Sequence, residues 1–249
     1  MFNIQKLIWP APFQVKACFT LRTGGVSQQP YRSFNLGAHV GDSPPDVISN
    51  RRQLLNNLQL ETITWLTQVH GNNVADLDVI DNDLLADTNN IVADACTSRA
   101  THRPCSVMTA DCLPVFFCNR AGTQVAMAHA GWRGLLSGVL QETLRTFGPT
   151  ASVMAYLGPA ISAQAFEVGD DVRMAFLCHN ASFGKHFEAS PTSQRWMGDL
   201  YAIAREILQQ SGVSEIYGGD RCTFTEKDAF FSYRRDGVTG RMANLIWLE

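Results

Sequence analysis

The sequence predicts an α/β fold, because short apolar runs alternate along the chain with longer segments whose apolar residues recur at helical spacing. No Pro/Ser-rich linker, internal repeat or low-complexity tract divides the 249 residues. Domains of the α/β class commonly reach this length. We therefore expect a single domain that spans residues 1–249.

Four helices are expected. The first covers residues 47–58 and follows two prolines that suit a first helical turn. The second runs from Arg133 to Phe147, where a glycine and a proline stop it. The third begins near Asp170, and the fourth begins near Asp199 and closes at a glycine. Each places apolar side chains on one face, so we expect all four to pack against sheets.

Between these helices lie apolar runs that are too short and too sharply bounded for helices, so we expect buried strands. They cover residues 106–109, 114–118, 125–128 and 153–157. The last part of the chain resembles a hairpin with arms at 230–233 and 241–247 and a turn that contains Asp236-Gly237. The C-terminal segment should therefore belong to a sheet.

Composition excludes several classes of protein. Apolar residues make up 45% and charged residues 17%, as in ordinary globular proteins, and a net charge of -3 disfavours nucleic-acid binding. The beginning lacks a signal peptide and no apolar run is long enough to span a membrane, so we expect a cytoplasmic protein without a membrane partner. Seven cysteines without a Cys-x-x-Cys pair indicate reduced thiols rather than disulfides or a zinc ribbon.

Three short islands stand out because each places a chemically active side chain beside glycine or proline, next to an apolar stretch. They contain His70, Cys112 and His129. Cys112 separates two predicted strands, and His129 ends the third of them before a Gly-Trp-Arg-Gly turn into a helix. The three lie too far apart for one helix to present them together, so the fold must gather them into one metal or thiol site.

Imidazole nitrogen and thiolate sulfur are good zinc ligands, and three protein ligands with an open fourth position describe a catalytic zinc, which activates water or polarises a substrate oxygen. Arg133, just after His129, would add a fixed cation for an anion. Two alternatives remain open. Cys112 can be a nucleophile with His129 or His70 as its base. A zinc-stabilised binding module would instead need a fourth ligand, for which the nearest candidates are Cys105, Cys118 and His102.

The remaining reactive residues carry weaker signals. The other histidines are expected in solvent or local hydrogen bonds, and the other cysteines as buried small hydrophobes. The glycine pair after Arg22 lacks the spacing of a phosphate-binding loop, so a tight turn explains it equally well. Asp111 either orients a neighbour, caps a turn or moves protons.

With these islands the chain resembles the YfiH-type family, whose members are variously named purine nucleoside phosphorylases, laccase-domain proteins or polyphenol oxidases. The resemblance runs nearly end to end. Its motifs are TLRTGGVS from Thr20, NLGAHVGD from Asn35, WLTQVHG from Trp65, Ala93-Asp94-Ala95, the three islands, LGPAI from Leu157 and FSYRR from Phe231. The resemblance implies a YfiH-like fold of mixed sheets flanked by helices, with His70, Cys112 and His129 as zinc ligands.

The resemblance also implies phosphate-dependent cleavage of adenosine, inosine, guanosine and methylthioadenosine, together with adenosine deamination. Purine nucleosides and phosphate would then be the partners of a monomer or weak homo-oligomer. On this basis the three ligands and Asp111, as a proton carrier, form the catalytic set. The expected substrate or phosphate contacts are Arg22, Arg133 and Arg234, with Asn35 contacting the sugar.

Two other activities belong to the alternatives. A Cys-His amide hydrolase with Cys112 as nucleophile would suit the editing of peptidoglycan precursors, with which some members are associated. A copper-dependent polyphenol oxidase needs a cysteine-bound copper and a histidine-rich trinuclear cluster, whereas the six histidines here include no His-x-His pair. Copper therefore remains only an alternative metal at the same ligands.

Overall fold

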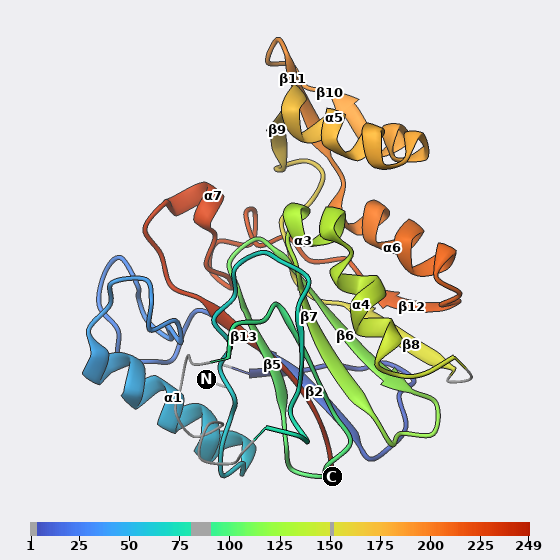
Figure 1. Ribbon diagram of the computed structural model, residues 1–249. Coiled ribbons are helices and arrows are strands. Elements are labelled where there is room, and N and C mark those ends of the chain that lie inside the picture. The colour runs from blue at the N-terminus through green and yellow to red at the C-terminus, as the bar shows by residue number, and fades with distance from the viewer. Residues whose placement is uncertain (1–3, 81–90, 150–151) are drawn as a thin grey trace.

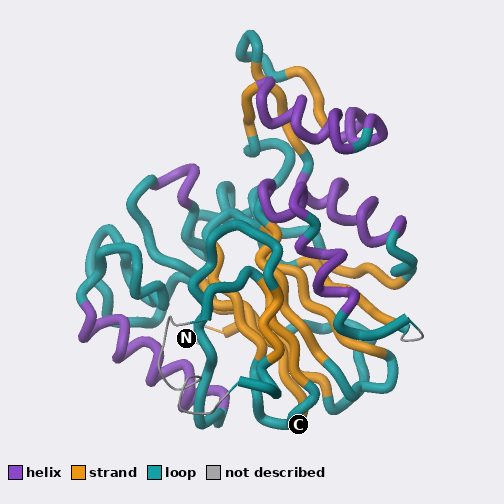
Figure 2. Tube along the Cα trace, in the orientation of Figure 1, coloured by secondary structure: helices purple, strands orange, loops and turns teal. Residues whose placement is uncertain are grey.

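The computed structural model describes residues 4–80, 91–149 and 152–249, which form a mixed α/β fold (Figures 1 and 2). The described strands form three sheets. The largest has the order β12-β8-β6-β7-β4-β3. Its strands are β3 (Val74–Asp76), β4 (Ala95–Ser98), β6 (Leu113–Asn119), β7 (Val125–Ala130), β8 (Val153–Leu157) and β12 (Glu215–Gly218). The outer pairs β12·β8 and β3·β4 are parallel and the inner pairs are antiparallel, so this sheet is mixed.

A second sheet of four antiparallel strands packs on the first. Its order is β1-β2-β13-β5, with β1 (Ile4–Lys6), β2 (Val15–Thr20), β5 (Cys105–Thr109) and β13 (Met242–Leu248). Side chains alternate between the two faces of each strand. Phe116 of β6 and Ile246 of β13 therefore lie in the core between the sheets. Their neighbours Phe117 and Leu245 point away from this core, each to the outer face of its own sheet.

Helices cover the outer face of each sheet (Figure 2). Helix α1 (Pro44–Leu58) inserts Leu54 beside Leu245 on the four-stranded sheet. On the six-stranded sheet lie α3 (Trp132–Ser137), α4 (Val139–Arg145) and α6 (Leu200–Gln210), whose buried apolar residues belong to the same core cluster as Phe117. The result is a four-layer arrangement of helix, sheet, sheet and helices. No helix in the described ranges is long and apolar enough to cross a membrane.

A small lobe projects beyond α3 and α6 at the top of Figure 1. It consists of β9 (Glu167–Gly169), α5 (Asp170–His179), the 3-10 helix η1 (Ala181–His186), β10 (Phe187–Ala189) and β11 (Arg195–Gly198). Phe176, Phe183 and Phe187 pack together inside it. The Glu206 carboxylate of α6 binds Ser182, Lys185 and His186 of η1, and so ties the lobe to the body.

Most predicted elements are confirmed, but two predictions are wrong. The helix expected from Arg133 to Phe147 is broken at Gly138, which has φ +87° and separates α3 from α4. The C-terminal hairpin does not form either. Its expected turn lies instead in and just after a short helix, α7 (Tyr233–Asp236), whose N-cap Ser232 accepts a hydrogen bond from the Arg235 amide. Strand β13 pairs with β2 and β5, so the expectation that it belongs to a sheet is confirmed.

Candidate metal centre

The fold brings the three island residues together at one end of the six-stranded sheet. His129 lies in β7, paired with Pro114 of β6, and Cys112 lies in the turn between β5 and β6. His70 lies in the loop before β3 and adopts a left-handed conformation with φ +61°. One potential ligand atom from each side chain lies within 4.8 Å of the others, and Cys112 Sγ is 3.8 Å from His70 Nε2. The predicted gathering is therefore confirmed.

Asp94 holds two of these residues in place, although its side chain is fully buried. Its carboxylate accepts backbone hydrogen bonds from Val69 (3.1 Å), His70 (2.9 Å) and Gly71 (2.7 Å), which fix the loop that carries His70. Its Oδ1 also lies 2.8 Å from His129 Nδ1. If Nδ1 donates to this carboxylate in the neutral imidazole, His129 Nε2 has a lone pair for a metal.

Gly131 leaves room for the side chains of Cys112 and His70. A Cβ atom at this position would lie 2.8 Å from Cys112 Sγ and 3.2 Å from His70 Cδ2. Contacts this short require the ligand side chains to move. The backbone conformation does not require glycine here, because a φ of -65° suits any residue. Glycine is required because a larger residue would displace the side chains of Cys112 and His70.

The ligands also change one another's proton affinity. Burial would raise the pKa of the Cys112 thiol, but the neighbouring His129 and His70 lower it to about 6. Burial would lower the pKa of His129, but the Cys112 thiolate and the Asp94 carboxylate raise it to about 9. Burial likewise disfavours ionised Asp94, yet hydrogen bonds from His129 and from backbone amides hold its pKa below the usual value. The arrangement therefore favours a thiolate at neutral pH.

These donors fit a tetrahedral zinc ion. Zn–N and Zn–S bonds of about 2.05 and 2.3 Å place nitrogen and sulfur ligands about 3.6 Å apart, close to the distance between Cys112 Sγ and His70 Nε2. Within the described residues, no fourth His, Cys, Asp or Glu joins the group. Cys105 and Cys118 are buried in the core between the sheets. The donor set therefore has the composition of an open three-ligand site.

The site opens into a cavity of about 430 Å³. Besides the three ligands, the cavity is lined by His39, Gln68, Met108, Thr109, Ala110, Arg133, Tyr233 and Arg241. Arg133 thus lies where the sequence predicted a cation, and its guanidinium packs on the Trp132 ring at 4.2 Å. Sequence reasoning missed Arg241, Tyr233 and His39, which come from distant segments.

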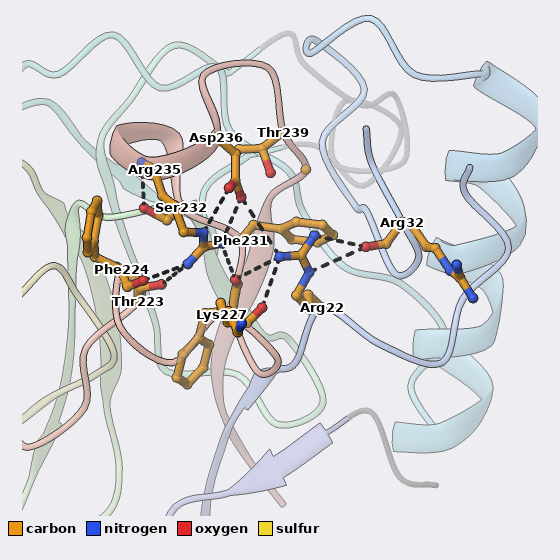
Figure 3. Close-up of polar contacts among 12 residues, drawn as sticks. Arg22, Arg32, Thr223, Phe224, Lys227, Phe231, Ser232, Arg235, Asp236 and Thr239 are labelled. Carbon is orange, nitrogen blue, oxygen red and sulfur yellow. Dashed lines mark hydrogen bonds and ion pairs between the residues drawn. The ribbon is translucent and has the colours of Figure 1, made fainter. Parts of the chain in front are cut away.

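Arg22 lies elsewhere, beside a separate hollow that also contains Arg32 and Lys227. Its guanidinium donates hydrogen bonds to the carbonyl oxygens of Arg32 and Lys227 and lies 3.8 Å from the Asp236 carboxylate (Figure 3). Asp236 also binds Arg235, whose guanidinium reaches the carbonyls of the preceding loop (Figure 3). Both arginines therefore anchor the chain around α7.

Three further predicted residues also have other partners. Asn35 is fully buried, and its side-chain oxygen accepts from the amides of Gly37 and Arg241. Arg234 donates to the Glu167 carbonyl of the lobe and does not line the cavity. The Asp111 carboxylate accepts from the Thr223 and Ser232 hydroxyls and from the Arg234 amide, at 2.6, 3.0 and 2.7 Å. Asp111 thus joins the Cys112 turn to the chain around α7.

The sequence matches the family model described as multi-copper polyphenol oxidoreductase laccase over residues 16–249. The chain belongs to this family. It is 50% identical over 243 residues to the purine nucleoside phosphorylase YfiH of Escherichia coli strain K12, with 96% of each chain covered. It is 47% identical to a purine nucleoside phosphorylase of Pseudomonas aeruginosa, with 97% of this chain and 96% of that protein covered.

Solved structures show the same fold. A Neisseria meningitidis protein superposes with a TM-score of 0.92 at 49% identity, with both chains covered completely. YlmD from Geobacillus stearothermophilus superposes with a TM-score of 0.82 at 30% identity, with 97% of this chain and 94% of that chain covered. The resemblance to YfiH-type proteins and the α/β fold expected from it are confirmed.

Proposed function

We propose that this chain is a zinc-dependent purine nucleoside phosphorylase that cleaves adenosine, inosine, guanosine and methylthioadenosine and also deaminates adenosine. The observation that carries this proposal is the open His70–Cys112–His129 group at the wall of a 430 Å³ cavity that contains arginines. The names of relatives that cover nearly the whole chain support the same reaction. Seven unpaired cysteines suit a reducing compartment, so we also propose that the protein is cytoplasmic. We propose in addition that the chain forms a single domain.

In phosphorolysis, an oxygen of phosphate forms a bond to C1′ of the ribose while the bond from C1′ to the purine nitrogen breaks. The electron pair of that bond stays on the purine, which takes up the proton of hydrogen phosphate, and the products are the free base and ribose 1-phosphate. Bound zinc would supply a Lewis acid beside the reacting oxygens. Arg133 contributes a permanent positive charge that holds the anionic nucleophile. Deamination adds water at C6 of adenosine and releases ammonia, leaving inosine.

The test uses protein whose zinc content has been measured. It is incubated with inosine or adenosine, with and without phosphate, and free base, sugar phosphate and ammonia are quantified. We expect base and ribose 1-phosphate to appear only with phosphate, inosine and ammonia to appear from adenosine, and Cys112→Ala to abolish all products. Equal release of free base without phosphate would exclude phosphorolysis.

The second candidate is a cysteine hydrolase, and the low pKa of Cys112 beside His129 favours it. Its thiolate would attack an amide carbonyl, for example in a peptidoglycan precursor, His129 would protonate the leaving nitrogen, and water would then hydrolyse the thioester to free Cys112. Alkylation of Cys112 stops both reactions. Only the zinc enzyme should also lose activity to a chelator and regain it with zinc.

Oxidation of phenols is disfavoured by the ligand set, because the described residues gather two histidines and one cysteine into the single group that could hold a metal. An oxygen electrode provides the check. Phenol-dependent oxygen uptake by copper-free protein should be absent, and addition of copper tests whether this metal can replace zinc.

A further inference from the structure

Arg241 lines the cavity beside His70, Cys112 and His129, and contacts with Asn35 and Gly37 position its side chain. Its amide donates to Asn35 Oδ1 at 2.9 Å, which fixes the backbone just before β13. Its aliphatic stem passes over Gly37, where a Cβ atom would lie 2.8 Å from Arg241 Cγ. The buried Asn35 and the bare Gly37 therefore position this side chain, although neither lines the cavity.

The guanidinium of Arg241 retains donors for a ligand. Nη1 donates to the carbonyls of Thr239 and Gly240, both at 3.0 Å. In the described parts of the chain, Nε and Nη2 have no hydrogen-bond partner and no carboxylate forms an ion pair with the group. One edge of the planar cation is thus fixed by backbone and the other is available. Two parallel N–H donors on one edge match two oxygens of a phosphate.

Arg241 keeps its positive charge inside the cavity. Desolvation lowers its pKa and the Cys112 and Asp111 charges act in the opposite direction, while arginine stays protonated at physiological pH. Its guanidinium lies 5.8 Å from the ring of Tyr233, so an aromatic face borders the same space. Arg133 lines the same cavity and has no carboxylate partner among the described residues. Among the described residues, the cavity therefore contains two guanidinium groups that form no ion pair with a carboxylate.

Building on the proposed phosphorylase function, we infer that Arg241, together with Arg133, binds the phosphate co-substrate beside the metal ligands. Arg241 presents its Nε/Nη2 edge to two phosphate oxygens, and Arg133 supplies the second positive charge. This assigns the phosphate subsite to a residue just before β13 and not to Arg22 or Arg234, whose guanidinium groups are engaged elsewhere. The ligand class is a tetrahedral oxyanion with two or more free oxygens.

The experiment measures binding of inorganic phosphate to the zinc-loaded protein by equilibrium dialysis and, separately, KM for phosphate and for inosine. Arg241→Gln should weaken phosphate binding and raise KM for phosphate about tenfold or more, the loss expected for a charge-assisted pair of hydrogen bonds. KM for inosine should change much less. The phosphate affinity of Arg241→Lys should lie between that of wild type and that of Arg241→Gln, because lysine keeps the charge but loses the paired donors.

One further variant tests the second arginine, and another controls for net charge. Arg133→Gln, at an exposed position, should weaken phosphate binding in the same direction. Arg145→Gln removes an exposed arginine on α4 and should leave phosphate binding unchanged. Phosphate affinity that is the same in Arg241→Gln as in wild type would overturn the subsite, as would wild-type protein that binds no phosphate. A wild type that binds phosphate through Arg241 but cleaves no nucleoside would overturn only the proposed function.

Discussion

The Asp94 carboxylate accepts the Nδ1 proton of His129 at 2.8 Å and also binds three consecutive backbone amides of the His70 loop. One fully buried side chain therefore sets both the orientation of one candidate ligand, His129, and the backbone conformation of another, His70. Groups that orient metal ligands in this way commonly change metal affinity by 10- to 100-fold when they are replaced.

We therefore expect Asp94→Asn to lower zinc affinity by about 10- to 100-fold, because the amide cannot accept the same set of hydrogen bonds. Competition with a chromogenic chelator measures this affinity. Asp78→Asn is the matched control, since Asp78 binds Ser98 and Arg99 away from the metal cavity. Unchanged zinc affinity in Asp94→Asn would show that the loop and imidazole keep their positions without the carboxylate.

Gly131→Ala should reduce bound zinc substantially while the protein remains folded. The new Cβ would lie 2.8 Å from Cys112 Sγ, so the ligand set must spread. Metal analysis of purified protein gives the zinc content, and circular dichroism reports folding. In Gly71→Ala the new Cβ meets no atom closer than 3.5 Å, so this variant should keep its zinc. Full zinc occupancy in Gly131→Ala would contradict the packing argument.

In metal-free protein, the rate of Cys112 alkylation by iodoacetamide should rise with pH through a midpoint of about 6. The thiolate is the reactive form, and its lowered pKa makes it the major form at neutral pH. Mass spectrometry of the labelled peptide identifies the site, and Cys112→Ser removes the signal. A midpoint near the ordinary thiol value of 9.0 would mean that the imidazoles do not stabilise the thiolate.

Glu206→Gln should destabilise the attachment of the lobe by about 1 kcal/mol at pH 7, as expected for a partly buried ionic network. Burial disfavours the ionised carboxyl, but Ser182, His186 and Lys185 lower its pKa from 4.5 to about 2. Since the folded pKa is depressed, this contribution is present above pH 4.5 and disappears as the pH falls towards 2.

Urea unfolding at several pH values measures this effect. The difference between Glu206→Gln and wild type should shrink steadily below pH 4.5. Glu188→Gln, which changes an exposed carboxylate on β10, should match wild type throughout. A difference that persists at the lowest pH would mean that lost packing, rather than lost charge, destabilises the variant.

The spacing of apolar residues was sufficient to predict those helices and strands that need only an apolar surface to pack against. Periodic apolar residues located α1 and α6, and the bounded apolar runs located β5 to β8 to within two residues. The same reasoning failed at Gly138, because the apolar face continues across a residue whose left-handed conformation ends the first helix. It failed again around α7, where the partners of β13 are distant in sequence and no hairpin turn is needed.

The gathering of His70, Cys112 and His129 could be predicted because His and Cys beside glycines carry their own chemical signal. Asp94 and Arg241 carry none alone, since their importance comes from contacts with distant segments. The Ala93-Asp94-Ala95 motif shared with the YfiH-type family was the available clue to Asp94. Arg22 is the converse case, because this arginine of a family motif binds backbone carbonyls in the structure (Figure 3), and its contact with substrate stays a prediction.

The central position of β13 in the four-stranded sheet has a consequence for the order of events during synthesis. Its neighbours, β2 and β5, are both translated earlier and do not pair with each other. Their sheet cannot close until residues 242–248 have left the ribosome, and β5 leads directly into the Cys112 turn. A nascent chain that lacks this segment should expose apolar strand edges and depend on chaperones. Metal capture should accordingly be a late step of folding.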